Sequence, residues 1–365
     1  MIRISRFYAW PLAIPCMALG LFVGGCSQPS PQGTAGTNGA SGGSTGTSTA
    51  AGTSAETSST ASAANSGLKV ALLTPGDIND QGWNQLAYEG LQAVQKDTGA
   101  QISHQVTKNS SDHEPALRDF GDKKYTLVLC HGFEFGKRVL AVAPRYPDTK
   151  FVVVGGNVKQ EPNVATLVPK LEEATYLLGM AAGGMTKSNI IGAIGGMKLP
   201  VIASTFDAYT AGAKAVNPKV NVLTNYIGSF EDQNAAKESA KSQMAQRADF
   251  IFHNADQAGK GMFNAAQEAK NVWVFGSNRD QNSVAPDVCL ASAIIAMPRA
   301  FVDLARDVQK NRFKAEFREL NMRNDTIAVE WNDALKNKVP PGLMQKINDA
   351  QKKIQSGQLK IKRNV

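Results

Sequence analysis

From residue 67 to residue 276, short apolar runs alternate with segments of helical periodicity, and this alternation constrains the fold more than any other feature of the chain. Apolar runs of about four to eight residues between turn residues are typical of buried strands, whereas apolar residues at every third or fourth position are typical of amphipathic helices. Strands that alternate with helices form parallel sheets with helices on both faces. The expected strands are 68–74, 125–130, 151–155, 189–194, 220–227, 249–253 and 272–276, and the expected helices are 83–97, 134–144, 174–187, 206–216, 232–246 and 259–269.

The segment between the first expected strand and the first expected helix is short and polar. Between Thr74 and Trp83 the chain reads Pro-Gly-Asp-Ile-Asn-Asp-Gln-Gly. Asp80 can cap the helix, because its carboxylate can accept the unpaired amides of the first turn. A loop at the carboxyl end of a parallel strand, leading into a helix, is a common ligand site in open α/β sheets. Two interpretations stay open from these residues alone: a polar turn whose Trp83 packs into the core, or a binding site with Trp83 in its wall.

The motif Gly-Asp-Ile-Asn-Asp-Gln-Gly-Trp-Asn-Gln, residues 76–85, resembles the first-loop motif of the basic membrane protein family. The family pattern is approximately Gly-Asp-hydrophobic-Asn/Asp-Asp-x-Ser/Gly-aromatic-Asn-Gln, and later motifs follow in the expected order to about residue 310. Members of this family are substrate-binding lipoproteins of ABC transporters and include purine nucleoside receptors. The resemblance is more specific than a single loop because it spans most of the chain after residue 67.

The resemblance implies an α/β, two-lobed fold of the type I periplasmic-binding-protein-like class, in which each lobe is a parallel sheet with helices on both faces. The chain would cross between the lobes near residues 168, 281 and 313, and a ligand would bind in the cleft between them. The implied N-lobe comprises residues 67–168 and 282–312, and the implied C-lobe comprises residues 169–281 and 313–365.

The N-terminal region has the features of a lipoprotein leader. In residues 1–25, Arg3 and Arg6 precede an apolar stretch that is too short for a permanent membrane span. Val-Gly-Gly-Cys, which ends at Cys26, matches a lipobox, although a signal peptide with an incidental cysteine is the alternative. Residues 26–66 would then be a lipidated cysteine and a flexible linker, because small and polar residues cannot bury enough apolar surface to fold. We therefore expect a cell-envelope protein, lipid-anchored to the membrane and facing the periplasm or the exterior.

The composition argues against nucleic-acid binding and against enzyme chemistry. The net charge of +8 comes without the clusters of Lys and Arg with interleaved aromatic residues that a nucleic-acid surface needs. The sequence has no P-loop or dinucleotide-binding pattern and no Gly-x-Ser-x-Gly elbow between an expected strand and an expected helix, and its histidines pair with no cysteine or carboxylate at a diagnostic spacing. We therefore expect no enzyme activity, no cofactor and no metal. Cys130 and Cys289 are expected to be inert buried thiols, although a disulfide between them stays open if both lie in one lobe.

Two aromatic residues are the main candidates for ligand binding. A flat polar ligand needs aromatic faces around its ring and amides or carboxylates at its edge. Trp83 can supply one face. The resemblance places a second aromatic residue in the other lobe, at Phe230, for which a core position at a strand end is the alternative. The two rings would close on a purine base, and each stacking contact would contribute about 1–3 kcal/mol.

Polar residues at the ends of neighbouring strands complete the expected ligand site. Asn84 matches a family asparagine that can read a base edge, because its amide both donates and accepts hydrogen bonds. The remaining candidates for ligand binding are Asp80, His131, Asp256, Asn278 and Asp280.

Four positions depart from the family pattern. Asn278, Ile295 and Gly155 stand where the resemblance implies an aspartate that contacts sugar hydroxyls, a lysine and a second aspartate. Asp256 lies where the family has glycine. An amide binds hydroxyls less strongly than a carboxylate, and losing a lysine together with an aspartate is charge-balanced. We therefore expect a retuned pocket, which holds a nucleoside differently or takes a purine base without ribose.

The leading hypothesis is a solute-binding lipoprotein of an ABC importer. It would capture a purine nucleoside or related purine base by hinge closure and deliver it to the permease and ATPase subunits. A membrane-tethered ligand sensor of the same fold is the first alternative, and a hydrolase on this scaffold is the second.

Overall fold

The computed structural model describes residues 67–364, all of which belong to one unit of the chain. The predicted signal segment (1–25), the lipidated Cys26 and the linker up to residue 66 lie outside the described residues. Across residues 67–364, no helix combines the length and the apolar composition needed to cross a membrane.

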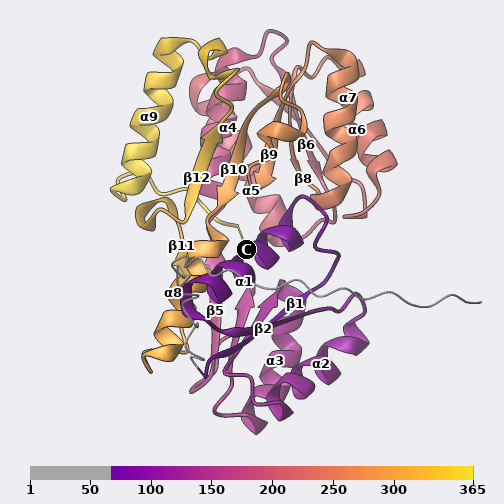
Figure 1. Cartoon of the computed structure of the whole chain (residues 1–365). Coiled ribbons are helices and arrows are strands. Elements are labelled where there is room, and N and C mark those ends of the chain that lie inside the picture. Colours follow the sequence, from indigo (N-terminus) through magenta and orange to yellow (C-terminus); the bar gives the residue numbers. More distant parts are fainter. Residues whose placement is uncertain (1–66, 365) are drawn as a thin grey trace, which may run out of the picture. The chain divides into compact units, whose positions relative to one another are not determined.

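The first sheet has six parallel strands in the order β11-β5-β4-β3-β1-β2 (Figure 1). Its strands are β1 (Lys69–Thr74), β2 (Gln101–Val106), β3 (Leu127–His131), β4 (Lys150–Val154), β5 (Val164–Pro169) and β11 (Phe317–Leu320). Successive residues of a strand point to opposite faces, so each strand feeds two hydrophobic clusters. On β1, Val70 and Leu72 belong to one cluster and Ala71 and Leu73 to the other.

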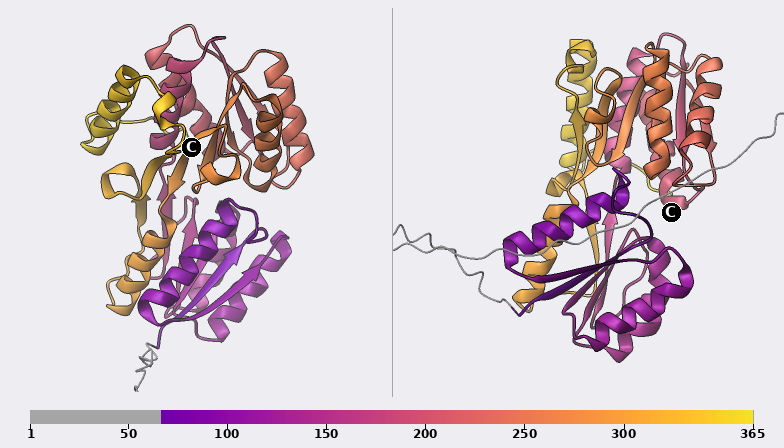
Figure 2. Two further views of the ribbon diagram at one scale, coloured as in Figure 1. Left: turned by 45° about the horizontal axis from the view of Figure 1, so that its top comes forward. Right: turned by 45° about the vertical axis from the view of Figure 1, so that its right-hand side comes forward.

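Helices cover both faces of this sheet. One cluster includes residues of α1 (Trp83–Thr98) and α8 (Met297–Gln309), which pack on each other. The other includes residues of α2 (Ser110–Asp122) and α3 (Gly136–Val142). The right-hand view of Figure 2 shows these helices on opposite sides of the sheet. We refer to the first sheet with α1, α2, α3 and α8 as the first lobe.

The second sheet also has six strands, in the order β12-β10-β9-β8-β6-β7, and only the β10–β12 pair is antiparallel. Its strands are β6 (Ile190–Gly195), β7 (Asn221–Tyr226), β8 (Phe250–Asn254), β9 (Trp273–Asn278), β10 (Cys289–Ile295) and β12 (Ile327–Trp331). Its helices are α4 (Glu172–Met185), α5 (Pro200–Val216), α6 (Gln233–Ala245), α7 (Gly259–Ala269) and α9 (Pro341–Gln355). On β8, Phe250 and Phe252 belong to the cluster of α4 and α5, and Ile251 to the cluster of α6 and α7. We refer to the second sheet with α4, α5, α6, α7 and α9 as the second lobe. Both sheets have helices on both faces, so the predicted α/β class is confirmed.

The sequence periodicity misses helices α2 and α8 and strands β2, β5, β10, β11 (Phe317–Leu320) and β12. Strand β2 has the sequence Gln-Ile-Ser-His-Gln-Val at the edge of its sheet, and its residues are exposed or half-buried. An edge strand needs no continuous apolar run, so its signal is weak. Helix α5 begins at Pro200, six residues before the expected start, because a proline is favourable in the first turn.

Two strands pair in a different sheet from the one expected. Strand β10 pairs with β9 and β12 in the second sheet, although residues 282–312 were assigned to the N-lobe. Strand β11 pairs with β5 in the first sheet, although residues 313–365 were assigned to the C-lobe. The chain therefore crosses after β5, after β10 and after β11, and not near residue 281. The lobe limits came from the resemblance and not from expected strands, so we correct them for β10 and β11. The other lobe limits stay predictions.

The two cysteines of the described residues are free and buried. Cys130 lies on β3 of the first sheet and Cys289 on β10 of the second, so the condition for a disulfide between them is not met. Burial raises the pKa of the Cys289 thiol to about 12 and that of Cys130 further. Both thiols are therefore protonated and unreactive near neutral pH, as predicted.

Candidate functional site

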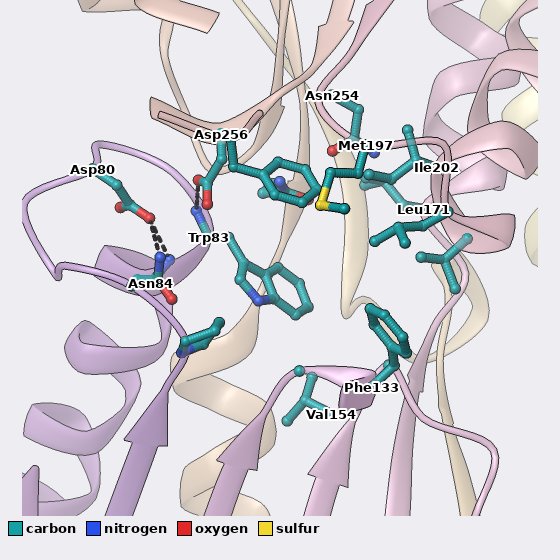
Figure 3. A pocket seen from close by; sticks show the side chains of 18 of the residues that line it. Asp80, Trp83, Asn84, Phe133, Val154, Leu171, Met197, Ile202, Asn254 and Asp256 are labelled. Atoms are coloured by element: carbon teal, nitrogen blue, oxygen red, sulfur yellow. Dashed lines mark hydrogen bonds between the residues drawn. The ribbon is translucent and has the colours of Figure 1, made fainter. Parts of the chain in front are cut away.

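A cavity of about 430 Å³ lies where loops at the carboxyl ends of strands from both sheets meet. The first turn of α1, which follows β1, contributes Trp83 and Asn84, the short 3-10 helix after β3 contributes Phe133, and the loop after β7 contributes Phe230. Strands of parallel sheets end at one edge, so this arrangement follows directly from the topology. Figure 3 shows the side chains around the cavity.

Trp83 is the first residue of α1, and its indole projects into the cavity (Figure 3). The ring stacks on the imidazole of His131, with centroids 3.9 Å apart and planes at 27°. Nε2 of His131 lies 2.9 Å from the backbone oxygen of Trp83 and therefore donates to it. Burial lowers the pKa of His131 to about 3, so the imidazole is neutral. His131 thus fixes the back of the indole.

Phe230 and Phe133 add two further aromatic side chains to the wall. The ring of Phe230 lies against Gly196, where a Cβ atom would come within 2.3 Å of its Cδ1, so this close approach requires glycine. Phe133 follows β3 and is 47% exposed although it lines the cavity. The second lobe contributes Met197, which is exposed to the same extent. The cavity therefore has apolar side chains from both lobes, with partly exposed ones from each.

Asp80 and Asn84 form a fixed polar pair at the start of α1. Asp80 is only 2% exposed and accepts backbone N–H groups of Gly82, Asn84 and Gln85 at 2.7–2.9 Å. The carboxylate therefore accepts amides of the first turn of α1 as predicted, although the N-cap residue of the helix is Gly82. The amide Nδ2 of Asn84 also donates to Asp80, at 2.8 Å (Figure 3). Oδ1 of Asn84 is buried and has no partner among residues 67–364. Because Nδ2 is engaged by a carboxylate, the free atom of Asn84 is a hydrogen-bond acceptor.

Asp256 of the second lobe contacts the start of helix α1 in the first lobe. Its Oδ1 accepts the backbone N–H of Trp83 at 2.7 Å (Figure 3). Gly82 lies directly against it, since a Cβ atom there would be 2.3 Å from Oδ1 of Asp256. Burial raises the pKa of Asp256 well above its usual value, and the neighbouring Asp80 carboxylate raises it further. The Trp83 N–H and Lys260 oppose this rise without reversing it.

Gln281 makes a second contact between the lobes. Its Oε1 accepts the backbone N–H of Ser277 at 2.8 Å and lies 2.9 Å from Nε2 of His253. Its Nε2 donates to the backbone oxygen of Gln81 in the first lobe, at 3.0 Å. Burial lowers the pKa of His253 to about 4, and the bond to Gln281 opposes that change. Arg279 adds an ion pair to Glu89 of α1 at 2.8 Å. The loop after β9 is thus tied to the first lobe by charged and neutral hydrogen bonds.

Six of the eight predicted ligand-binding residues line the cavity. These are Asp80, Trp83, Asn84, Phe230, Asp256 and Asn278. His131 lies behind Trp83 and is outside the set of described residues that line the cavity. Asp280 is exposed, also outside that set, and its Oδ1 accepts the N–H of Asn282 at 2.9 Å. We therefore withdraw both from the ligand site: His131 acts as support, and Asp280 caps a turn.

The sequence analysis missed several residues of the wall. The crossing from β5 to α4 contributes Leu171 and Glu172, and the tail after α9 contributes Arg363. No sequence motif connects these two segments. Ile202 lies on α5, in a turn that the predicted helix did not include. Phe133 could have been found, since it lies three residues after the predicted strand 125–130, in a loop with the candidate His131.

The wall of the ligand cavity contains many more acidic than basic side chains. The acidic residues that line the cavity are Asp77, Asp80, Glu134, Glu172, Glu231 and Asp256. Arg363 is the one lysine or arginine among the lining residues of the described chain, and it faces Glu172. Burial raises the pKa of Glu134. Ile295 and Gly155, which replace charged residues of the family pattern, also line the cavity. Such a wall repels anions and accepts hydrogen bonds more readily than it donates them.

Comparisons with known proteins agree on one family. The family model described as ABC transporter substrate-binding protein PnrA-like matches residues 68–365. The ABC transporter nucleoside-binding protein BmpA of Lactococcus lactis is 33% identical over 226 residues, which cover 59% of this chain and 64% of that protein, a little less than two thirds of its length. An uncharacterised lipoprotein of Pyrococcus furiosus is 27% identical over 280 residues, or 73% of this chain and 70% of that protein.

Solved structures show the same fold. An ABC transporter solute-binding protein from Conexibacter woesei superposes with a TM-score of 0.68 at 25% identity, over 81% of this chain and 99% of that one. The predicted two-lobed, type I periplasmic-binding-protein-like fold is therefore confirmed, as is the resemblance drawn from the first-loop motif.

Proposed function

Because the chain belongs to the family of PnrA-like ABC transporter substrate-binding proteins, which are not enzymes, we propose that it binds a purine nucleoside or a related purine base in the cavity between its lobes. The observation that carries this proposal is the pair Trp83 and Phe230, which come from different lobes and line one cavity. Two aromatic side chains can hold a planar heterocycle, with about 1–3 kcal/mol from each stacked face. The name of the Lactococcus relative supports the same class of ligand.

The size and the charge of the cavity narrow the class of ligand. Its volume of about 430 Å³ lies within the range of roughly 300–1,000 Å³ that small-molecule sites occupy. The excess of carboxylates disfavours a phosphate, so the proposed cargo is a nucleoside or base and not a nucleotide. The free Oδ1 of Asn84 can accept a hydrogen bond from an N–H group at the edge of the base. Asn278, Ile295 and Gly155 leave fewer charged contacts for ribose, which brings free bases into the proposed range.

We further propose that the protein is anchored by lipid at Cys26 and works with a permease and an ATPase of an ABC importer. The lipobox before Cys26 and the lipoprotein relative support the anchor. Replacing Cys26 by serine should release the protein from the membrane fraction and abolish incorporation of labelled palmitate. Palmitate incorporation that persists in the variant would refute the anchor at this residue.

Isothermal calorimetry tests the ligand. The purified domain should bind at least one of inosine, guanosine, adenosine, hypoxanthine and adenine, and it should bind adenosine more tightly than adenosine monophosphate. If none of these purines binds, the proposed ligand class is wrong, whereas family membership is unaffected.

A further inference from the structure

One end of the cavity contains a buried charged pair whose hydrogen bonds are incomplete. Glu172, the first residue of α4, is 3% exposed and lines the cavity beside Leu171. Its Oε1 lies 3.6 Å from Nε of Arg363, which is an ion-pair distance but too long for a hydrogen bond. Among residues 67–364, neither Oε2 of Glu172 nor Nε of Arg363 has a hydrogen-bond partner. Both atoms are therefore available to a third group.

Arg363 is held in place by the tail that follows α9. Its Nη1 donates to the backbone oxygen of Pro169 at 2.7 Å, and its side chain is 12% exposed. The next residue, Asn364, donates through its backbone N–H to Oγ of Ser204 at 3.1 Å and through Nδ2 to Asp207 at 2.8 Å. The tail thus joins the crossing after β5 to helix α5, and the guanidinium cannot move freely away from Glu172.

The pair also separates two cavities. Glu172 and Arg363 line the ligand cavity and a second cavity of about 340 Å³. Glu173, the neighbouring residue on α4, lines the second cavity alone, and its Oε2 accepts the backbone N–H of Met322 at 2.6 Å. Of the two adjacent acids, Glu173 accepts a backbone N–H, whereas Oε2 of Glu172, which lines both cavities, has no partner among residues 67–364.

A buried carboxylate oxygen without a partner is costly, because it has lost its water and gained no hydrogen bond in return. Native structures keep few such atoms, and those that remain are commonly completed by a ligand, an ion or a water. An anion is disfavoured by the acidic wall. A neutral or cationic group that donates a hydrogen bond fits the free oxygen.

We infer that Glu172 is a specificity-determining residue, whose Oε2 accepts a hydrogen bond from a hydroxyl or amino group of the bound ligand, and that Arg363 positions its carboxylate. This inference rests on the proposed function, since it assumes that a purine nucleoside or base occupies the cavity. The donor is either a sugar hydroxyl or an exocyclic amine of the base. A ligand that offers only a carbonyl oxygen at this point would be repelled by the carboxylate.

Calorimetry with adenosine and adenine tests the inference on four variants. Glu172→Gln should weaken binding of the donor-bearing ligand roughly tenfold to a hundredfold, as expected for a hydrogen bond to a charged group. If adenosine alone is affected, the donor is a sugar hydroxyl; if both are affected, it is the amine. The matched control Glu173→Gln, whose amide oxygen can still accept from Met322, should bind like the wild type. Arg363→Lys should retain most of the affinity that Arg363→Ala loses.

Two further results keep the inference falsifiable. If Glu172→Gln fails to fold because it leaves Arg363 unpaired, the double variant Glu172→Gln/Arg363→Met removes both charges and should show the same loss of affinity. Wild-type affinity in either folded variant would overturn the role of Glu172 and leave the proposed function standing. Absence of purine binding by the wild-type protein would overturn both.

Discussion

Replacing Asp256 by asparagine should make ligand affinity independent of pH in weakly acidic and neutral solution. In the present arrangement of the lobes, Asp256 accepts the N–H of Trp83 and lies next to the Asp80 carboxylate, which is itself held by four hydrogen bonds. Burial and this like charge raise the pKa of Asp256 well above 3.8, and Lys260 only partly offsets them. If the lobes separate when the ligand leaves, Asp256 returns to water and to its ordinary pKa.

The sign and size of the effect follow from proton linkage. Closure binds a proton at any pH between 3.8 and the raised pKa of Asp256, so affinity falls as pH rises through that window. The limiting slope is one proton, which corresponds to about 1.4 kcal/mol or tenfold per pH unit. Between pH 5 and 7 the wild-type protein can thus lose up to about a hundredfold in affinity.

Asparagine reproduces the protonated state of Asp256. Its carbonyl oxygen can accept the Trp83 N–H, and its amide can donate to Asp80. Asparagine also tolerates the positive φ of 53° at this residue better than most side chains. The variant should therefore bind at pH 7 at least as tightly as the wild type does at pH 5. Asp280→Asn is a suitable control, because Asp280 is an exposed acid away from the cavity wall and its loss should leave the wild-type slope unchanged.

Calorimetry from pH 5 to pH 8, with a purine that does not titrate in this range, measures both slopes. Repeating one pH value in buffers of different ionisation enthalpy counts the protons taken up directly. A wild-type affinity that stays constant or rises with pH would refute the reasoning, and so would a wild-type slope that persists in Asp256→Asn.

Three further predictions concern the same region. Trp83→Ala should weaken purine binding by about 1–3 kcal/mol in calorimetry, and an unchanged affinity would remove the indole from the site. Gly82→Ala should weaken purine binding at least tenfold without lowering the thermal midpoint of unfolding, since the alanine methyl group would lie 2.3 Å from Oδ1 of Asp256 and force the lobes apart. An affinity equal to that of the wild type would show that binding does not need the contact between Gly82 and Asp256. In the Asp256→Asn variant, which lacks the opposing proton uptake of Asp256, the free energy of unfolding in urea should fall as pH decreases from 6.5 towards 4. Each of His131 and His253 contributes up to about 1.4 kcal/mol per unit, because their pKa values of about 3 and about 4 keep them neutral in the folded protein while the unfolded chain takes up protons. A free energy of unfolding that rises in this variant as pH decreases would contradict the neutral, buried state of both rings.

The sequence predicts the parts of the fold that depend on local periodicity. Strands such as β3 and β8 are continuous apolar runs, and their ends mark the loops that line the cavity. The lobe assignment of the residues that form β10 and β11 was wrong, because the sheet that a strand joins depends on residues far away in the chain. The edge strand β2 was missed because none of its residues is buried, so its sequence carries little periodic signal.

The candidate site could be predicted only where one loop supplies both the motif and the chemistry. Asp80, Trp83 and Asn84 lie within one loop and the first turn of α1, so their local geometry follows from capping. His131 was predicted to bind the ligand because it follows a predicted strand. Only the three-dimensional structure shows that its imidazole stacks behind the indole of Trp83. Glu172 and Arg363 meet through the crossing after β5 and the tail after α9, which no local pattern connects.

The altered family positions and the free polar atoms lead to one conclusion about the ligand. Ile295 removes a cation from the wall. The buried atoms without hydrogen-bond partners there in the described chain are two acceptors, Oδ1 of Asn84 and Oε2 of Glu172, and one donor, Nε of Arg363, whose charge is paired with Glu172. A ligand that is rich in carbonyl groups would face acceptors with acceptors, whereas amino and hydroxyl groups would complete them. Stacking on Trp83 does not distinguish between these ligands, because every base has an aromatic face. We therefore expect selectivity among purines to come from their donors, with adenine or adenosine preferred over hypoxanthine, and a preference for hypoxanthine would contradict this assignment of acceptors.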